Sequence, residues 1–406
     1  MVDFQYSAMA GRLRRSEIRE LLKLTRNPET ISFAGGLPDP AIFPYDAVEA
    51  ASLRAIHACG RHALQYSPTE GDPFLKEQLI QFMARHGEPV KPENLLVVAS
   101  SQQGIDLLSK VFIDPGDPII VERPTYVGTI QAFRAFNADF HGAEIDHDGV
   151  IPEKLEQLVI RLIDEGRKPK FVYLIPDFQN PSGITLSLER RSQVLALATA
   201  YDLVIVEDSP YRELRYEGDL LPSLYSLDRD GRVIQLKTFS KIFCPGFRIG
   251  WMVGPAEVID KFVMAKQGTD LCTAAYVSII AGFLIQDGHL EKQIEISKKL
   301  YQRKRAAMLA ALEKYMPKID GLWWSKPEGG MFLWLQLPEG IDANDMIDDA
   351  IDLKVAFVIG SCFFHDGSNR NTMRLNYSYP TEEQIAEGIR RLATLVERRL
   401  AVSPVR

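Results

Sequence analysis

The segment TFSKIFCPGFRIGW, residues 238–251, places an amine, a hydroxyl and a guanidinium within one short stretch. The amine belongs to Lys241, which follows an apolar run that we expect to form a strand. A rigid strand end can hold a lysine amine against a bound aldehyde, where it is nucleophilic once its pKa is lowered. Ser240 and Arg248 could supply a hydroxyl and a planar cation to a phosphate group. A lone lysine is more often a solvated surface charge, so this segment needs support from others.

Two further segments place polar side chains directly after expected strands. In VEDSPYREL, residues 206–214, Asp208 ends a buried run, at the position where open α/β sheets bind ligands. Its carboxylate could pair with a protonated ring nitrogen, and the phenol of Tyr211 could face the same ring; the alternative is a helix-capping aspartate. In IPDFQNPSG, residues 175–183, Asn180 could donate a hydrogen bond to a ligand oxygen, although Asn-Pro-Ser-Gly is also ordinary turn sequence.

The remaining candidates precede or begin expected helices. Ser101 and Gln102, in VVASSQQGIDLL, lie at a strand-to-helix junction, where exposed N–H groups bind anions; a serine N-cap is the alternative. Tyr126, in ERPTY, offers an aromatic face on which a planar ring could stack. Pyridoxal 5′-phosphate requires such a set: a phosphate cradle, a stacking ring, an acid for its pyridine nitrogen and an amine for its aldehyde. The residues that together predict this cofactor are Ser101, Tyr126, Asn180, Asp208, Tyr211, Ser240, Lys241 and Arg248.

The elements that must position these residues alternate between strands and helices. Strands separated by helical crossovers indicate βαβ units and an α/β fold with a mostly parallel sheet. The short connection between the last two strands cannot hold a helical crossover, so we expect one antiparallel strand there. The expected strands are residues 95–99, 119–122, 171–175, 203–207, 233–236 and 249–253, and the expected helices between them are residues 102–112, 127–136 and 188–200.

Towards the C-terminus the pattern changes. A long charged stretch with helical spacing precedes the runs MFLWLQL, VAFVIG and TMRLNYS and a final helix. We therefore expect a smaller α/β domain over residues 291–406, packed on a large cofactor-binding domain over residues 41–290. Residues 1–40 are expected to form an N-terminal arm and helix that join the small domain, with Ser16 as the N-cap of SEIRELLKL.

Composition and charge exclude several classes of protein. The chain has 406 residues, 46% of them hydrophobic and 25% charged, as in globular proteins of two or three domains. Its net charge of −7 provides no basic surface for nucleic acid or an anionic membrane. Four cysteines without CxxC spacing argue against a zinc site or disulfide framework and favour a reducing cytoplasm. We also expect no secretory signal and no membrane-spanning run, and the charge balance favours a small-molecule partner.

From about residue 16 to its last helix, the chain resembles the fold-type I, class I and II aminotransferases that use pyridoxal phosphate. Within that family it is most similar to the 2-aminoadipate (kynurenine/aminoadipate-like) aminotransferases. The segments that carry the likeness, in matching order and spacing, are SFAGGLPDP, LQYSPTEG, SQQGIDLL, FQNPSG, VEDSPYREL, TFSK…PGFRIGW and MRLNYS.

The resemblance implies a role for each cofactor residue. Lys241 would form the internal aldimine and then move the proton of the substrate Cα, while Asp208 keeps the pyridine nitrogen protonated. Asn180 and Tyr211 would bond the phenolic oxygen O3′ of the cofactor, and Tyr126 would stack on its ring. The residues implied to hold the phosphate are Ser101, Gln102, Ser240 and Arg248.

The resemblance also implies contacts with the substrate and a second subunit. Arg374, in MRLNYS, matches the arginine whose fork binds the substrate α-carboxylate, beside Asn180. Gly36 would line the substrate pocket, where backbone approaches closely. Arg19 matches a residue of a mobile N-terminal helix that pairs with a distal substrate carboxylate; a solvated arginine is the alternative. Tyr66 would reach the phosphate of the neighbouring subunit, which implies a homodimer with shared active sites.

The expected activity is transamination of an L-amino acid that is 2-aminoadipate-like, aromatic or otherwise long. A 2-oxo acid such as 2-oxoglutarate would be the acceptor, in a ping-pong mechanism. The cofactor residues also suit a lyase or decarboxylase, which is the first alternative. A non-catalytic effector-sensing module is the second, although few residues precede GGLPDP to form a DNA-binding head.

The chain also departs from the family pattern in places. Ala99-Ser100 stands where relatives often have Ser-Gly, so the phosphate loop could sit differently, and NPSG replaces the common NPTG while keeping a hydroxyl. LCTAAYVSII, residues 271–280, lies in a region that lines the pocket of relatives, so substrate preference does not transfer across it.

Overall fold

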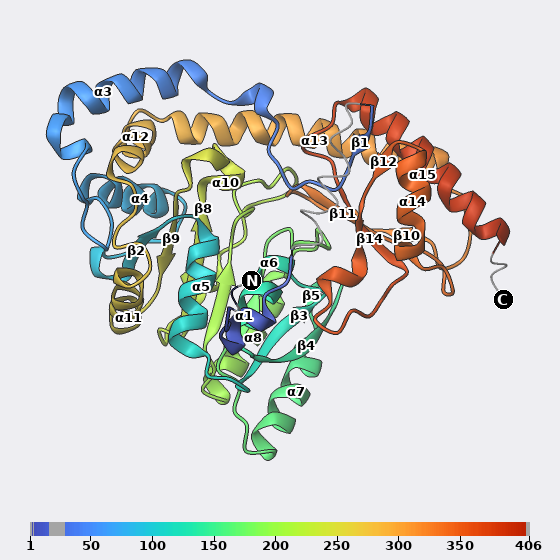
Figure 1. Cartoon of the computed structure of the whole chain (residues 1–406), viewed down its shortest axis with the longest axis horizontal. Coiled ribbons are helices and arrows are strands. Elements are labelled where there is room, and N and C mark those ends of the chain that lie inside the picture. Colours follow the sequence, from blue (N-terminus) through green and yellow to red (C-terminus); the bar gives the residue numbers. More distant parts are fainter. Residues whose placement is uncertain (1, 3, 16–28, 403–406) are drawn as a thin grey trace.

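An eight-stranded sheet lies at the centre of the larger part of the molecule (Figure 1). The computed structural model describes residues 2, 4–15 and 29–402. In these ranges the helices are α1 (Ala8–Arg12), α3 (Tyr45–Ala63), α4 (Pro73–Arg85), α5 (Ser101–Phe112), α6 (Val127–Ala135), α7 (Pro152–Asp164), α8 (Leu188–Ala200), α9 (Leu224–Leu227), α10 (Phe239–Ile242), α11 (Ala256–Gln267), α12 (Ala275–Gln286), α13 (His289–Tyr315), α14 (Ile347–Asp352) and α15 (Glu382–Val402). The strands are β1 (Ile31–Ser32), β2 (Leu95–Val98), β3 (Pro118–Arg123), β4 (Asp139–Asp146), β5 (Gly149–Val150), β6 (Val172–Leu174), β7 (Ile205–Asp208), β8 (Val233–Thr238), β9 (Gly250–Val253), β10 (Trp323–Trp324), β11 (Phe332–Gln336), β12 (Val355–Ala356), β13 (Val358–Ile359) and β14 (Thr372–Asn376).

The strands of the large sheet follow the order β2-β9-β8-β7-β6-β3-β4-β5. From β8 to β4 every neighbouring pair is parallel, whereas β9 is antiparallel to both β2 and β8. The mostly parallel sheet confirms the predicted fold class. The antiparallel β9 confirms the expectation drawn from the short connection after β8, which holds only α10 and a turn.

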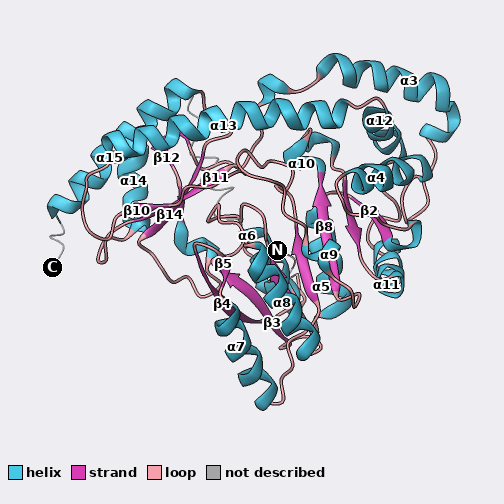
Figure 2. Ribbon diagram, turned by 180° about the vertical axis from the view of Figure 1, so that it is seen from behind, coloured by secondary structure: helices cyan, strands magenta, loops and turns pink. Residues whose placement is uncertain are grey.

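Both faces of the large sheet are covered by helices (Figures 1 and 2). Val121 on β3 belongs to a core shared with α5, α6 and α11, whereas its neighbour Ile120 belongs to a core shared with α7 and α8. Successive side chains of a strand point to opposite faces, so each face needs its own apolar residues. This two-sided burial explains why the strands are nearly continuous apolar runs in the sequence.

A second, smaller sheet has the antiparallel order β10-β11-β14-β13. The long α13 reaches from α12 to this smaller part, where it packs against α15 (Figure 1). The run VAFVIG differs from the single strand expected there. Its first half is β12, which pairs with β1, and its second half is β13, which pairs with β14. The chain near residue 31 is thereby tied to the C-terminal part of the molecule.

Among the described helices, none combines the length and apolar character needed to cross a membrane.

Candidate active site

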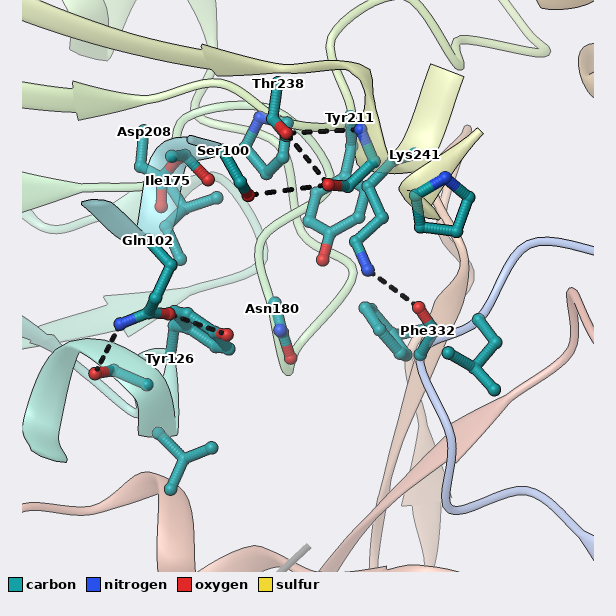
Figure 3. Close-up of a pocket in the computed structure, with 18 of the residues that line it drawn as sticks. Ser100, Gln102, Tyr126, Ile175, Asn180, Asp208, Tyr211, Thr238, Lys241 and Phe332 are labelled. Atoms are coloured by element: carbon teal, nitrogen blue, oxygen red, sulfur yellow. Dashed lines mark hydrogen bonds between the residues drawn. The ribbon is translucent and has the colours of Figure 1, made fainter. Parts of the chain in front are cut away.

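The parallel strands of the large sheet end at a cavity of about 890 Å³ (Figure 3). Arg374 and Phe332 of the small sheet close its other side. Tyr66 does not line the cavity of its own chain and is 75% exposed, and Arg19 lies outside the described residues. The predicted residues that the fold brings to the cavity are Gly36, Ser101, Gln102, Tyr126, Asn180, Asp208, Tyr211, Ser240, Lys241, Arg248 and Arg374.

Lys241 lies in the short helix α10, directly after β8. Thr238 caps this helix, since its Oγ1 accepts a hydrogen bond from the backbone N–H of Ser240 at 3.1 Å. The Lys241 amine donates to the backbone oxygen of Gly36 at 2.7 Å (Figure 3). Burial, followed by the nearby charges of Arg374 and Arg248, lowers the pKa of Lys241 to about 8. A lysine with this pKa supplies far more neutral, nucleophilic amine near pH 7 than a solvated one does.

Gly36 is placed where a side chain would disturb this arrangement. A Cβ added there would lie 3.1 Å from the ring of Phe332 and 4.0 Å from the Lys241 amine. The absence of a side chain thus lets the backbone reach the lysine.

Asp208 is the last residue of β7 and is buried. Its Oδ2 accepts a hydrogen bond from the phenol of Tyr173 at 2.5 Å, whereas its Oδ1 is buried without a hydrogen-bond partner among the described residues. Burial raises the pKa of Asp208 to about 6, opposed by the Tyr173 hydrogen bond and the charge of Lys241. Buried polar atoms in native proteins nearly always form hydrogen bonds, so we expect Oδ1 to accept one from a bound group. A protonated pyridine nitrogen fits that requirement.

An anion site is formed where α5 begins. Ser101 is the first residue of α5, so unpaired backbone N–H groups face the cavity there. The hydroxyl of Ser240 lies 3.5 Å from that of Ser100, and Arg248 Nη1 donates to the same Ser240 hydroxyl at 3.4 Å. A helix start, hydroxyls and a guanidinium are the groups that bind a phosphate.

The backbone at this anion site is conformationally unusual. Ser100 has φ 74° and ψ 160°, a region that glycine adopts far more readily than serine. The departure from Ser-Gly to Ala99-Ser100 therefore leaves a serine in a glycine-like conformation. Gly250 on β9 permits this packing, because a Cβ there would lie 2.7 Å from the Ser100 carbonyl carbon and the Ser101 nitrogen.

Tyr126 and Gln102 line the cavity from the starts of α6 and α5. The phenol of Tyr126 donates to Gln102 Oε1 at 3.3 Å, and Gln102 Nε2 donates to the backbone oxygen of Gly128 at 3.4 Å (Figure 3). These contacts orient an aromatic ring beside the cavity, as a planar cofactor would require. Tyr211 and Asn180 lie between this ring and Lys241 in the same view.

Arg374 enters the cavity from β14 and is buried. Its guanidinium lies 4.1 Å from the ring centre of Phe332 and 5.0 Å from that of Phe363. It donates through Nη1 to Asn180 Oδ1 and through Nη2 to the Ala34 backbone oxygen, both at 2.8 Å. Burial lowers its pKa to about 10, so it stays charged at neutral pH. In the described part of the chain no carboxylate is among the charges that shift the pKa of this cation, so it can receive one from a ligand.

Several residues at the site were not identified from the sequence, among them Thr238 and Ser100 near the anion site, Phe332 beneath Arg374, Tyr173 behind Asp208, and Arg14 and Arg15 of the N-terminal arm. Thr238 and Ser100 adjoin predicted residues, so a helix-capping pattern could have found them. Phe332 and Tyr173 lie within apolar strands and have no local signal that separates them from other core residues.

The comparisons with known proteins agree with this geometry. The family model for aminotransferase class I and II matches residues 38–392. Aromatic-amino-acid aminotransferase 1 of Thermococcus litoralis is 44% identical over 97% of this chain and 94% of the relative. The 2-aminoadipate transaminase of Thermus thermophilus is 41% identical over 97% of this chain and 96% of the relative.

A solved structure is similar as well. It is LysN, the α-aminoadipate aminotransferase of Thermus thermophilus, complexed with N-(5′-phosphopyridoxyl)-L-leucine. It superposes with a TM-score of 0.90 at 39% identity, over 98% of each chain.

Proposed function

The chain belongs to the class I and II aminotransferases, and from this premise we propose which residues perform the reaction and on which substrates. It is a pyridoxal-phosphate-dependent enzyme that transfers an amino group between an amino acid and a 2-oxo acid. The observation that carries the assignment of residues is the cavity itself. The amine of Lys241, with its lowered pKa, and the unpartnered Oδ1 of Asp208 belong to residues that line the same space.

When bound, pyridoxal phosphate supplies an aldehyde for amines and a protonated ring that withdraws electrons from the substrate Cα. Asp208 would hold the proton of the ring nitrogen, and Tyr126 would set the plane of the ring. Asn180 and Tyr211 would bond the phenolic oxygen. Lys241 Nζ would remove the proton from the substrate Cα and deliver it to the cofactor atom C4′. The residues proposed to hold the phosphate are Ser101, Gln102, Ser240 and Arg248, with Ser100 beside them.

We propose that the donor is an L-amino acid with a long acidic or aromatic side chain and that 2-oxoglutarate is an acceptor. The activities named for the relatives at 44% and 41% identity support this range. Arg374 would bind the α-carboxylate of each substrate in turn. Arg14 and Arg15, in the described part of the N-terminal arm, also line the cavity, which favours acidic side chains. The role of Arg19 remains a prediction.

We also propose a homodimer with shared active sites. Tyr66 follows α3, and apolar side chains are exposed on this helix and just after it, among them Leu53 at 55% and Leu64 at 74%. Clustered apolar exposure of this kind marks protein–protein interfaces. A second copy would cover these residues and receive Tyr66 at its phosphate site.

Two further proposals accompany this function, one on the domain division and one on the location. The division into an arm over residues 1–40, a large domain over 41–290 and a small domain over 291–406 is supported by the separate sheets, and the arm by the β1–β12 pairing. A cytoplasmic location is supported by the four cysteines, none of which forms a disulfide in the structure.

A panel of L-amino acids tests the reaction and the substrate range together. Conversion of the bound cofactor to its amine form, followed by absorbance, should be fastest with 2-aminoadipate, kynurenine or aromatic amino acids and should reverse on adding 2-oxoglutarate. Release of pyruvate and ammonia from cysteine-type substrates, without reversal by 2-oxoglutarate, would instead establish the lyase alternative.

A further inference from the structure

Asp208 is contacted by a phenol for which the proposed reaction has no role. Tyr173 lies on β6 and is fully buried. In the parallel pairing of β6 with β7, Tyr173 is opposite Val206, two residues before Asp208. Because side chains two apart on a strand share a face, Tyr173 and Asp208 leave the sheet on the same side. The phenol spans the remaining distance and donates to Asp208 Oδ2 at 2.5 Å.

We propose that Tyr173 is a positioning residue that keeps Asp208 anionic and directs its free oxygen, Oδ1, towards the ring nitrogen of the cofactor. The inference rests on the proposed function, which assigns Asp208 to that nitrogen. A carboxylate has two oxygens, and the phenol occupies one of them. The other, Oδ1, is buried with no hydrogen-bond partner among the described residues, so it can accept from the N–H of the ring.

Burial alone would neutralise Asp208, because it disfavours a charged carboxylate. The hydrogen bond from Tyr173 and the charge of Lys241 oppose that effect, and together they limit the rise in the pKa of Asp208 to about 6. Glu122 also faces Asp208, but burial raises the pKa of Glu122 to about 8, so near pH 7 it adds little negative charge beside Asp208. A neutral acid at Asp208 could not hold the ring nitrogen protonated.

The ring of Tyr173 is packed independently of its hydroxyl. Its edge meets the ring of Phe133 at a centroid distance of 5.9 Å and an interplanar angle of 86°. The same core contains Val121 and Val206 on the neighbouring strands. Phenylalanine can keep these contacts, so Tyr173→Phe leaves the ring in place and removes only the hydroxyl, with its hydrogen bond to Asp208 and its contact with the Thr129 side chain.

The test measures binding of two probes to the apo protein: pyridoxal 5′-phosphate and its 1-deaza analogue, whose ring carries carbon in place of the nitrogen. Tyr173→Phe should weaken binding of pyridoxal phosphate about tenfold, as expected for a hydrogen bond to a charged group. The analogue has no N–H for Asp208, so its affinity should change less than about twofold. The matched control is Tyr201→Phe, which removes another phenol–carboxylate contact, to Glu156 at 2.8 Å, and should leave both affinities unchanged.

Equal losses for the two probes would show a merely structural role and overturn the proposal, as would unchanged binding of pyridoxal phosphate. Asp208→Asn separates this outcome from failure of the proposed function. If Asp208 does not serve the ring nitrogen, that variant binds pyridoxal phosphate as the wild type does. If it does, Asp208→Asn weakens binding, and adding Tyr173→Phe to it should cost less than about twofold more.

Should Tyr173→Phe fail to fold, 3-fluorotyrosine at position 173 provides the second measurement. It keeps the ring and hydroxyl but donates more strongly, so pyridoxal phosphate should bind more tightly while the 1-deaza analogue is unaffected. Unchanged or weaker binding of pyridoxal phosphate would overturn the proposal.

Discussion

Lys237 and Lys241 are four residues apart on the adjoining elements β8 and α10, and their surroundings differ. The side chain of Lys237 is 1% exposed, and its amine lies 2.6 Å from Glu88 Oε2 and 2.8 Å from Glu213 Oε1. Lys241 lines the cavity, where its amine donates to the backbone oxygen of Gly36. Within the described residues it forms no ion pair.

The pKa values of the two amines shift in opposite directions. Burial lowers the pKa of both, but Glu213 and Glu88 outweigh burial at Lys237, whose pKa is raised. At Lys241 the charges of Arg374 and Arg248 add to the effect of burial and outweigh the opposing charge of Asp208, which brings the pKa to about 8. Burial without an ion-paired carboxylate is therefore what lowers the pKa of Lys241, whereas burial beside two carboxylates leaves that of Lys237 raised.

The largest effects should come from replacing each of the two lysines, in turn, with methionine. Lys241→Met should lower the rate of transamination by about 10⁴-fold or more, because the amine that we propose carries the proton is lost. Its free energy of unfolding should be at least that of the wild type, since an uncompensated buried amine is removed. Steady-state kinetics and urea unfolding of the same preparation measure both. A rate within tenfold of the wild type would exclude Lys241 as the acid–base group.

Lys237→Met should have the opposite profile. It leaves Glu88 and Glu213 buried without their shared cation, so the free energy of unfolding should fall by about 3–5 kcal/mol. The folded fraction should keep a transamination rate within a few-fold of the wild type, because Lys237 does not line the cavity. Urea unfolding is compared at fixed protein and cofactor concentration. An unchanged free energy of unfolding would show that the ion pairs of Lys237 with Glu88 and Glu213 stabilise the fold no more than the packing of methionine does.

Glu207 tests the buried charges around Lys237 through their pH dependence, because it is a further buried carboxyl beside Glu88. Gln235 donates to both Glu88 and Glu207, and burial, followed by the charge of Glu88, raises the pKa of Glu207 to about 7. Between pH 4.5 and 7 the unfolded chain releases this proton while the folded protein keeps it, so stability falls as pH rises. The shift corresponds to about 3 kcal/mol, fully expressed above pH 7.

Glu207→Gln should remove this contribution. Relative to the wild type, the variant should gain about 3 kcal/mol of unfolding free energy between pH 4.5 and pH 8. Urea unfolding across this range measures the gain, and Glu257→Gln, at an exposed position on α11, is the matched control. A difference between variant and wild type that does not vary with pH would mean that Glu207 is not protonated in the fold.

Substituting Arg374 tests the surroundings of Lys241, which has this cation near it whereas Lys237 has carboxylates. Arg374→Met should raise KM for amino-acid donors about 100-fold, because the proposed charge-assisted pair with the α-carboxylate would be lost. The pKa of Lys241 should also rise, since Arg374 is the first neighbouring charge that lowers it. The pH dependence of the rate at which the apo protein captures pyridoxal phosphate reports that pKa. Arg390→Met, an exposed arginine paired with Glu387, is the control and should change neither.

Much of the large sheet could be predicted, because its strands are buried on both faces and read as apolar runs. The strand β4 was not identified, since most of its side chains are only partly buried and its polar sequence DFHGAEID carries no such run. The division of VAFVIG between two sheets could not be predicted from the sequence either. It depends on the pairing of the first half with β1 and of the second half with β14.

By itself the sequence determined the family and the cofactor and indicated the strand ends at which we propose that the chemistry occurs, because those motifs are local and most of the proposed cofactor residues follow a recognisable strand. Tertiary structure decided which of several similar groups face one another. It pairs Lys237 with carboxylates and leaves Lys241 without one, and it sets Tyr173 against Asp208, 35 residues further along the chain. Such contacts depend on strand register and on the burial of each face, and neither is encoded within one segment.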